Sequence, residues 1–161
     1  MTRVDPHLLT QDLTHRPTHL LTQDLTPPAI FAMRLMSFSH TTPQILDRSK
    51  TVTRRTGWRF LKPGDLVQAV EKTRGRKPGE PIRALAVLQI VDVRIEPLSR
   101  LRTDPRYAED ELPREGFPCW STTEFLELFC AANNLKTLAA DITRIEFRYV
   151  EAGRPDGSAT A

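Results

Sequence analysis

The sequence is short of the residues that build metal centres and disulfide scaffolds. Its 161 residues include two cysteines, Cys119 and Cys130, and three of its four histidines lie within the first 20 residues. A structural zinc site takes four Cys or His ligands at suitable spacing, and His40 is the one histidine left for the rest of the chain. We therefore expect no metal, no cofactor and no disulfide framework. A cysteine nucleophile is disfavoured as well, because it would need a nearby histidine.

The sequence also lacks a long apolar run. No stretch reaches the ~18 consecutive apolar residues that a membrane-spanning helix requires, so we expect no membrane partner. Polar residues follow Arg3, whereas a signal peptide would continue into an apolar segment, and the expected location is therefore the reducing cytoplasm. Hydrophobic residues make up 39% of the chain and charged residues 27%, which is typical of a soluble globular protein. A length of 161 residues suits a single domain.

The first 32 residues contain no glycine and no lysine, but they contain a duplication: residues 7–14 read HLLTQDLT, and residues 19–26 repeat it. Two copies are too few for a solenoid, which needs at least three stacked units. One interpretation is a docking peptide whose leucines contact a partner, so that the chain acts as a protein-interaction adaptor. The other, favoured by the composition, is an unstructured extension preceding a start at Met33 or Met36. We therefore divide the chain into an extension at 1–33, a domain at 34–151 and a flexible tail at 152–161.

The remaining chain alternates short strand patterns with two helical ones. A turn at Pro63-Gly64-Asp65 separates two strand segments, and the alternation slips around Gln89, which indicates a β-bulge. Ser121 and Glu124 have capping-box spacing at the start of an apolar helical stripe. We expect strands at 34–39, 48–55, 66–71, 82–95 and 143–150, a short helix from Thr41 or Thr42, a loop plus short helix at 99–114, and a helix at 121–133. This pattern predicts an α+β domain in which several short antiparallel strands form a curled sheet or small barrel.

The net charge of +3 is too small to require a polyanionic partner, but the cations are concentrated in one segment. Between Arg48 and Lys62 there are six cations and no acid, with Trp58 and Phe60 interleaved among them. Arginine binds phosphate in a bidentate way, and aromatic faces accept stacked bases, so this pattern is typical of a nucleic-acid or nucleotide surface. The alternative is a solvated strand face whose tryptophan belongs to the core. The lack of any acid in the segment favours binding.

Lys50-Thr51-Val52-Thr53-Arg54-Arg55 resembles the K-x-x-T-x-R element of the ASCH domain, a member of the PUA-like superfamily. Three other parts of the chain resemble that family's pattern in the same order: Pro63-Gly64-Asp65, the segment Ala86–Ile95, and Glu115-Gly116-Phe117 followed by Ser121-Thr122-Thr123-Glu124-Phe125. The resemblance covers Leu35–Val150 and is strongest to the stand-alone bacterial and phage branch. One position departs from the pattern. Arg48 stands where the family usually has glycine, and a left-handed turn there would be strained in arginine.

The resemblance implies a small PUA-like β-barrel with short flanking helices and a cleft that binds RNA or a modified nucleoside. The basic segment would then supply the binding residues, which are Arg54, Arg55, Trp58 and Arg59. Some small bacterial members act as amidohydrolases on N4-acetylcytidine, and their catalytic set corresponds by position to Lys50, Thr53 and Glu115. Other members are ribonucleases, which we consider the less fitting activity for this chain. The sequence thus leaves open whether the protein is an enzyme or a binding module.

The catalytic interpretation carries chemical and geometric conditions. A threonine hydroxyl is a poor nucleophile until a base removes its proton, and the like charges of Arg54 and Arg55 would lower the pKa of Lys50 toward that role. Glu115 could move a proton to the leaving amine or orient the lysine. Residues three apart in a strand face opposite sides, so Lys50 must lie in a turn before the strand, or a bulge must intervene. The alternative for each of the three is ordinary: a solvated lysine, a strand threonine and a glutamate on an exposed loop.

Overall fold

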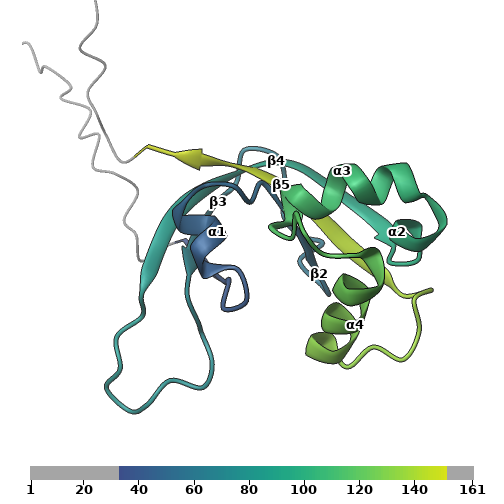
Figure 1. The fold of residues 1–161 in the computed structure, drawn as a ribbon. Coiled ribbons are helices and arrows are strands. Elements are labelled where there is room, and N and C mark those ends of the chain that lie inside the picture. Colours follow the sequence, from purple (N-terminus) through teal and green to yellow (C-terminus); the bar gives the residue numbers. More distant parts are fainter. Residues whose placement is uncertain (1–32, 152–161) are drawn as a thin grey trace, which may run out of the picture.

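The computed structural model describes residues 33–151, in which one curled five-stranded sheet arches over helices (Figure 1). The elements in chain order are β1 (Arg34–Ser37), α1 (Thr42–Leu46), β2 (Val52–Arg55), β3 (Leu66–Val70), β4 (Ala84–Pro97), α2 (Arg100–Thr103), α3 (Pro105–Glu115), α4 (Thr122–Asn133) and β5 (Asp141–Val150). The duplicated segment and the C-terminal tail lie outside the described residues. The α+β class is confirmed, and the sheet has the form of a half-barrel.

The strand order is β1-β3-β4-β5-β2, so β1 and β2 lie at opposite edges of the sheet. The pairs β3–β4, β4–β5 and β2–β5 are antiparallel, as expected. The pair β1–β3 is parallel, which corrects the expectation of antiparallel pairing. A parallel pair needs a long crossover, and here α1 and β2 supply it, because the chain visits the far edge of the sheet before it returns as β3.

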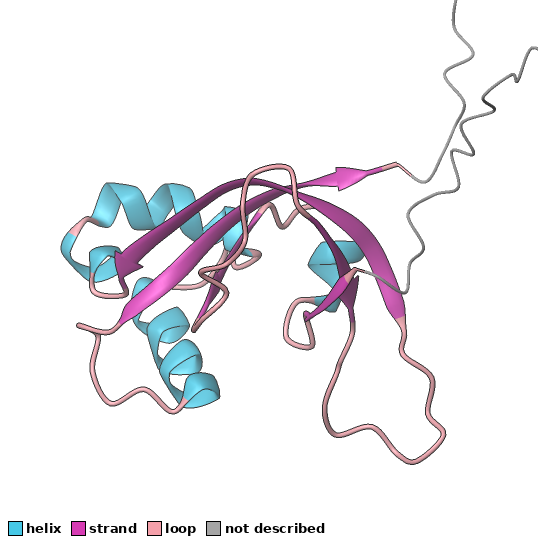
Figure 2. Ribbon diagram, turned by 180° about the vertical axis from the view of Figure 1, so that it is seen from behind, coloured by secondary structure: helices cyan, strands magenta, loops and turns pink. Residues whose placement is uncertain are grey.

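The long strands β4 and β5 curve across the sheet in Figures 1 and 2. The pairing register between them shifts between Ile90 and Asp92, and Val91 is left 44% exposed. This bulge lies two residues beyond the slip that the alternation around Gln89 predicts. Because the bulge inserts one residue, Ile90 and Val93 both face the apolar core, although residues three apart in a regular strand would face opposite sides.

Two apolar clusters lie beneath the sheet. The first joins the strands to α1 through Met36, Ile45 and Phe147, and the second joins α2, α3 and α4 through Leu101, Leu112 and Phe125. On β5 the two clusters are separated by a polar pair, since Ile142 belongs to the second cluster, Ile145 to the first, and the buried residues Thr143 and Arg144 lie between them. A polar layer between two cores is the setting of the candidate site.

The segment 99–114 is more helical than expected, because α2 and α3 occupy most of it. Asp104 caps α3 with its side chain, and Pro105 follows in the first turn, where a missing N–H is tolerated. The inward stripe of α3 is half acidic: Ala108, Glu111, Leu112 and Glu115 are buried. Helical periodicity is normally recognised from apolar residues, so glutamates on the buried face concealed how much of the segment is helical.

Helix α4 confirms the capping box predicted for its start. The Ser121 hydroxyl accepts a hydrogen bond from the Glu124 backbone N–H at 3.2 Å, and the Glu124 carboxylate accepts one from the Ser121 backbone N–H at 2.7 Å. Phe125 and Phe129 on the same helix are buried in the second cluster. Within the described residues, no helix has both the length and the apolar character needed to span a bilayer.

Candidate functional site

A cavity of about 590 Å³ opens between the two apolar clusters. Its walls include Phe38 from the first cluster and Phe125 from the second. Its polar and aromatic lining comes from five parts of the chain and includes His40, Lys50, Thr53, Arg54, Arg55, Trp58, Lys72, Arg74, Glu115 and Asn133. The pocket therefore gathers most of the residues that the sequence singles out. Arg59 is the exception: it is exposed and does not line the cavity.

The strand β2 divides its polar residues between two surroundings. Successive side chains of a strand face opposite sides, so Thr53 and Arg55 share one face and Arg54 takes the other. Thr53 is buried and lines the pocket. Lys50 lies two residues before the strand begins, which meets the geometric condition for bringing it to the same pocket as Thr53. The expected strand from residue 48 is accordingly shorter and begins at Val52.

Lys50 and Glu115 are in contact inside the pocket. The Lys50 Nζ lies 3.3 Å from Glu115 Oε1 and also donates to the Glu115 backbone carbonyl. Glu115 is the last residue of α3, and Gly116 ends the helix in the left-handed region at φ 100°. A side chain at Gly116 would approach Gln44 Cγ to 3.2 Å, so glycine suits both the backbone angle and the space.

The pKa of Lys50 is lowered to about 8, in the predicted direction but for a different main reason. Burial of the ammonium group is the largest cause, the negative charge of Glu115 opposes it, and Arg55 and Arg54 lower the pKa further. The charges of the two arginines, from which the sequence predicts the shift, contribute less than burial. Burial dominates because only 2% of Lys50 is exposed.

Arg55 is a partly buried cation whose recorded partners are a hydroxyl, a carbonyl and an aromatic ring. Its Nε donates to the Thr53 hydroxyl at 3.3 Å, its Nη2 donates to the Ser37 carbonyl, and its guanidinium carbon lies 4.8 Å from the centre of the Phe38 ring. Among the described residues, no carboxylate forms a salt bridge with it. Burial lowers the pKa of Arg55 to about 10, although Glu115 opposes this shift. The guanidinium is therefore available to a ligand in the pocket.

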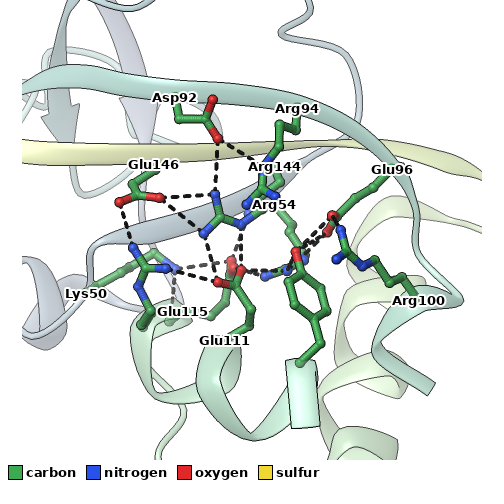
Figure 3. Close-up of polar contacts among 12 residues, drawn as sticks. Lys50, Arg54, Asp92, Arg94, Glu96, Arg100, Glu111, Glu115, Arg144 and Glu146 are labelled. Atoms are coloured by element: carbon green, nitrogen blue, oxygen red, sulfur yellow. Dashed lines mark hydrogen bonds and ion pairs between the residues drawn. The ribbon is translucent and has the colours of Figure 1, made fainter. Parts of the chain in front are cut away.

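Arg54 borders the same pocket, but its guanidinium is fully buried in an ionic network (Figure 3). Its Nη2 lies 2.7 Å from Glu111, 3.1 Å from Glu96 and 3.1 Å from the Tyr107 hydroxyl. Its Nη1 lies 3.0 Å from Glu115 Oε2, and its backbone N–H donates to Glu115 Oε1 at 2.8 Å. Arg54 thus holds both oxygens of the carboxylate that contacts Lys50.

The ionic network continues from Arg54 through Glu111 to Arg144, as Figure 3 shows. Arg144 donates to the two Glu111 oxygens at 2.6 and 2.8 Å, and it also contacts Glu146 at 3.2 Å. Burial raises the pKa of Glu111, but the hydrogen bonds and charges of Arg144 and Arg54 outweigh it and lower the pKa to about 2. We call this set of side chains, from Glu96 and Arg54 to Glu111, Arg144 and Glu146, the buried network.

Three residues of the basic segment adopt left-handed backbone angles. Gly57 and Trp58 have φ of 79° and 59°, and this turn places the half-buried indole of Trp58 beside the first cluster and in the pocket lining. Arg48 has φ of 63°, so the backbone keeps a left-handed turn where the ASCH pattern usually has glycine. Arg48 also pairs with Glu151 at the surface.

Sequence reasoning missed the part of the pocket formed after β1 and β3. His40 and Arg74 are exposed, Lys72 is partly buried, and all three line the cavity. The cations Arg74, Arg76 and Lys77, which lie in the loop between β3 and β4, were a usable signal of a charged surface. Nothing local to that loop indicates that it lies near β2. No group of three or more His, Cys, Asp or Glu side chains in residues 33–151 is placed to hold a metal ion.

Comparison with known proteins yields no relative with an established function. No protein-family model matches the chain, and no curated protein matches it significantly. The solved structures that resemble it include the hypothetical protein PH0355, with 13% identity and a TM-score of 0.49 over 73% of this chain and 98% of that chain. Another is protein EF3133 of family DUF984 from Enterococcus faecalis V583, with 12% identity and a TM-score of 0.39 over 73% of this chain and 80% of that chain.

Proposed function

We propose that the protein is an ASCH-type, PUA-like domain whose pocket binds a nucleoside base, either free or within single-stranded RNA. The observation that carries this proposal is that Arg55 and the half-buried indole of Trp58 line the same cavity, and that Arg55 has no salt-bridge partner within residues 33–151. An indole offers a face on which any base can stack, and the guanidinium offers donors to ligand oxygens. A cavity of about 590 Å³ is of the size that small-molecule sites commonly have.

The other predicted binding residues take different parts in this proposal. The guanidinium of Arg54 forms salt bridges with Glu96, Glu111 and Glu115. In this proposal it therefore positions Glu115 and does not contact the base. Arg59 lies outside the cavity and contributes at most to the general positive charge around its mouth.

Calorimetric titration with cytidine, N4-acetylcytidine and a short oligoribonucleotide tests the binding proposal. We expect Trp58→Leu and Arg55→Gln to weaken binding about tenfold each, since each removes a contact worth roughly 1–3 kcal/mol. Arg59→Gln is the matched control from the same basic segment and leaves the affinity unchanged. Affinity for the oligoribonucleotide falls as salt increases. The proposal is wrong if none of the three ligands binds, or if Arg59→Gln weakens binding as much as Arg55→Gln.

A second candidate function is amide hydrolysis on an N4-acylated cytidine. The observation that favours it is that Lys50, Thr53 and Glu115 line one pocket, with the Lys50 amine 3.3 Å from the Glu115 carboxylate. With a pKa of about 8, about a tenth of Lys50 is neutral at pH 7, compared with a far smaller fraction for an exposed lysine. A neutral amine in contact with the pocket is a competent general base.

The reaction in this candidate proceeds in two balanced steps. The Thr53 oxygen attacks the acyl carbon while Lys50 takes the hydroxyl proton, and the ammonium then gives that proton to the departing cytidine amine. Lys50 then takes a proton from water as the water attacks the threonine ester, and it returns that proton to the departing Thr53 oxygen, which releases the carboxylic acid. Arg55 donates to the Thr53 oxygen at 3.3 Å and orients it, which leaves the hydroxyl proton directed elsewhere. Glu115 fixes the amine, and Arg54 fixes Glu115.

Release of cytidine and acetate from N4-acetylcytidine, followed by chromatography, tests this candidate. We expect Lys50→Met and Thr53→Val to reduce the rate by about 10²–10⁴-fold. Thr51→Val is a matched control, because Thr51 lies two residues before Thr53 in the sequence and does not line the pocket. The rate should rise with pH toward about 8 as Lys50 loses its proton. Full activity in Thr53→Val, or no turnover by the unaltered protein at high concentration, contradicts catalysis.

A further inference from the structure

We infer that the ligand carries a phosphate group, which the pocket holds between Arg55 and Arg74. This inference rests on the proposed function and narrows it from nucleosides to phosphorylated nucleotides. It follows from the balance of charges in the pocket wall and from the hydrogen bonds that join β2 to the loop after β3.

The cations of the pocket fall into two groups. Lys50 is neutralised by Glu115, and Arg54 by three carboxylates. Lys72 lies 2.8 Å from Glu80. Within residues 33–151, Arg55 and Arg74 have no salt-bridge partner, although both line the cavity. The lining contains two cations in excess, contributed by different parts of the chain.

The acidic group of the pocket already has cationic partners. Glu115 is the one carboxylate in the described lining, and it accepts hydrogen bonds from Lys50 and from Arg54. It therefore cannot serve Arg55 as a full counter-charge. A neutral nucleoside would leave the charges of Arg55 and Arg74 without a counter-charge. A phosphate monoester brings up to two negative charges and three acceptor oxygens.

Hydrogen bonds place the start of the Arg74 loop close to Arg55. Ser37 ends β1, its carbonyl accepts from Arg55 Nη2, and its hydroxyl donates to the Glu71 carbonyl at 3.2 Å. Glu71 immediately follows β3, and Lys72 and Arg74 come next in the same loop. The route Arg55–Ser37–Glu71 thus connects the partly buried guanidinium to the beginning of the loop that carries the exposed one.

Arg55 is suited to accept such a group. Its Nε and Nη2 have protein partners, while the structure records none for Nη1 among the described residues. A partly buried guanidinium has lost part of its hydration, and a charge-assisted hydrogen bond to phosphate restores that interaction. Thr53 and Thr73 also line the cavity, and a threonine hydroxyl can donate to a phosphate oxygen.

Two sources could present this phosphate: a free nucleoside monophosphate or an internal phosphodiester of RNA. Calorimetry at low salt with four probes distinguishes them: cytidine, cytidine 5′-monophosphate, ribose 5-phosphate and the dinucleotide CpC. We expect cytidine monophosphate to bind at least about tenfold more tightly than cytidine, because charged hydrogen bonds are the stronger kind. Tighter binding of CpC than of the monophosphate would indicate the RNA source, and the reverse would indicate the free nucleotide.

Arg74→Gln isolates the phosphate contact, because Arg74 is exposed and its replacement leaves the core intact. The variant should lose about tenfold in affinity for cytidine monophosphate and keep its affinity for cytidine. Arg76→Gln is the control, since Arg76 is exposed in the same loop and does not line the cavity. Equal affinities for cytidine and its monophosphate, or an equal loss for both ligands in Arg74→Gln, overturn the inference.

The probes also separate this inference from the proposed function. Binding of ribose 5-phosphate without binding of cytidine supports the phosphate site and counts against the base pocket. Binding of cytidine with no gain from phosphate leaves the proposed function standing and ends the inference. If no phosphate-bearing probe binds, the phosphate site does not exist.

Discussion

Arg54 and Arg55 are neighbours in β2, but one belongs to the buried network and the other to the pocket. Arg54 is fully buried and is surrounded by Glu96, Glu111 and Glu115. Arg55 is partly buried and has a hydroxyl, a carbonyl and an aromatic ring as its partners. The arginines of the network are paired with buried carboxylates, so we expect the network to act mainly on stability. In the pocket, by contrast, Arg55 has no salt-bridge partner among residues 33–151, and this is the part of the molecule where we propose that a ligand binds.

The two regions meet at Glu115, whose carboxylate contacts Arg54 on one side and Lys50 on the other. The network thereby fixes the position of an acidic group in the pocket. A positive charge alone does not mark a binding residue, because the surroundings decide whether that charge is already used.

The largest expected effect separates the two arginines by stability. Arg54→Met should lower the free energy of unfolding by about 3–5 kcal/mol, because it leaves three buried carboxylates without their shared cation. Arg55→Met removes no salt bridge and should change it by about 1 kcal/mol. Urea unfolding of both variants measures the difference. Equal losses would mean that the two arginines have the same structural role, and the comparison would fail.

Acid should weaken the buried network. The pKa of Glu111 is lowered to about 2 in the folded protein, from an ordinary value of 4.5. Its contribution to stability is therefore complete above about pH 4.5 and is lost as the pH falls toward 2. Urea midpoints measured between pH 5 and pH 2.5 should fall steeply in the unaltered protein and less steeply in Glu111→Gln. Glu109→Gln, an exposed neighbour on α3, should retain the steep fall.

Alkaline pH should increase the stability of the folded protein, because Lys50 in the pocket loses its proton. The folded-state pKa of Lys50 is depressed to about 8 from 10.5, so between these values the unfolded chain binds more protons than the folded one. Stability therefore rises with pH from about 8, because deprotonation removes a buried charge. Thermal unfolding between pH 7.5 and pH 9.5 measures the rise, before the tyrosines titrate. Lys50→Met should abolish it. A fall in stability over this range would show that Glu115 outweighs burial.

The sequence predicts the elements that depend on local rules. Ser121 and Glu124 mark the start of α4, and the slip in alternation marks the bulge near Val91. Hydrogen bonds between neighbours in the chain determine such features. The class α+β follows from them as well.

The remaining features depend on contacts between distant parts of the chain. Arg54 pairs with Glu111, 57 positions away, and no local pattern assigns a carboxylate to one of two adjacent arginines. Arg74 reaches the pocket because β3 pairs with β1 in parallel, which the sequence does not indicate. The basic segment was recognisable, but the division of its cations between network and pocket required the fold.

The smallest effect concerns Arg48, which belongs to neither region. It is a half-exposed cation that pairs with Glu151 at the surface, and its backbone has φ of 63°. This left-handed angle destabilises the folded state by about 1 kcal/mol or more at an L-residue, but not at glycine. Exposed ion pairs contribute only about 0–1 kcal/mol, so the backbone strain should be at least as large as the contribution of the ion pair.

We therefore expect the free energy of unfolding of Arg48→Gly to be about 1 kcal/mol higher than that of Arg48→Ala. Both variants lose the ion pair, but only the alanine variant keeps the strained backbone. Glu151→Gln measures the ion pair separately. If the glycine and alanine variants are equally stable, the left-handed turn carries no strain, and the departure of Arg48 from the ASCH pattern has no cost in stability.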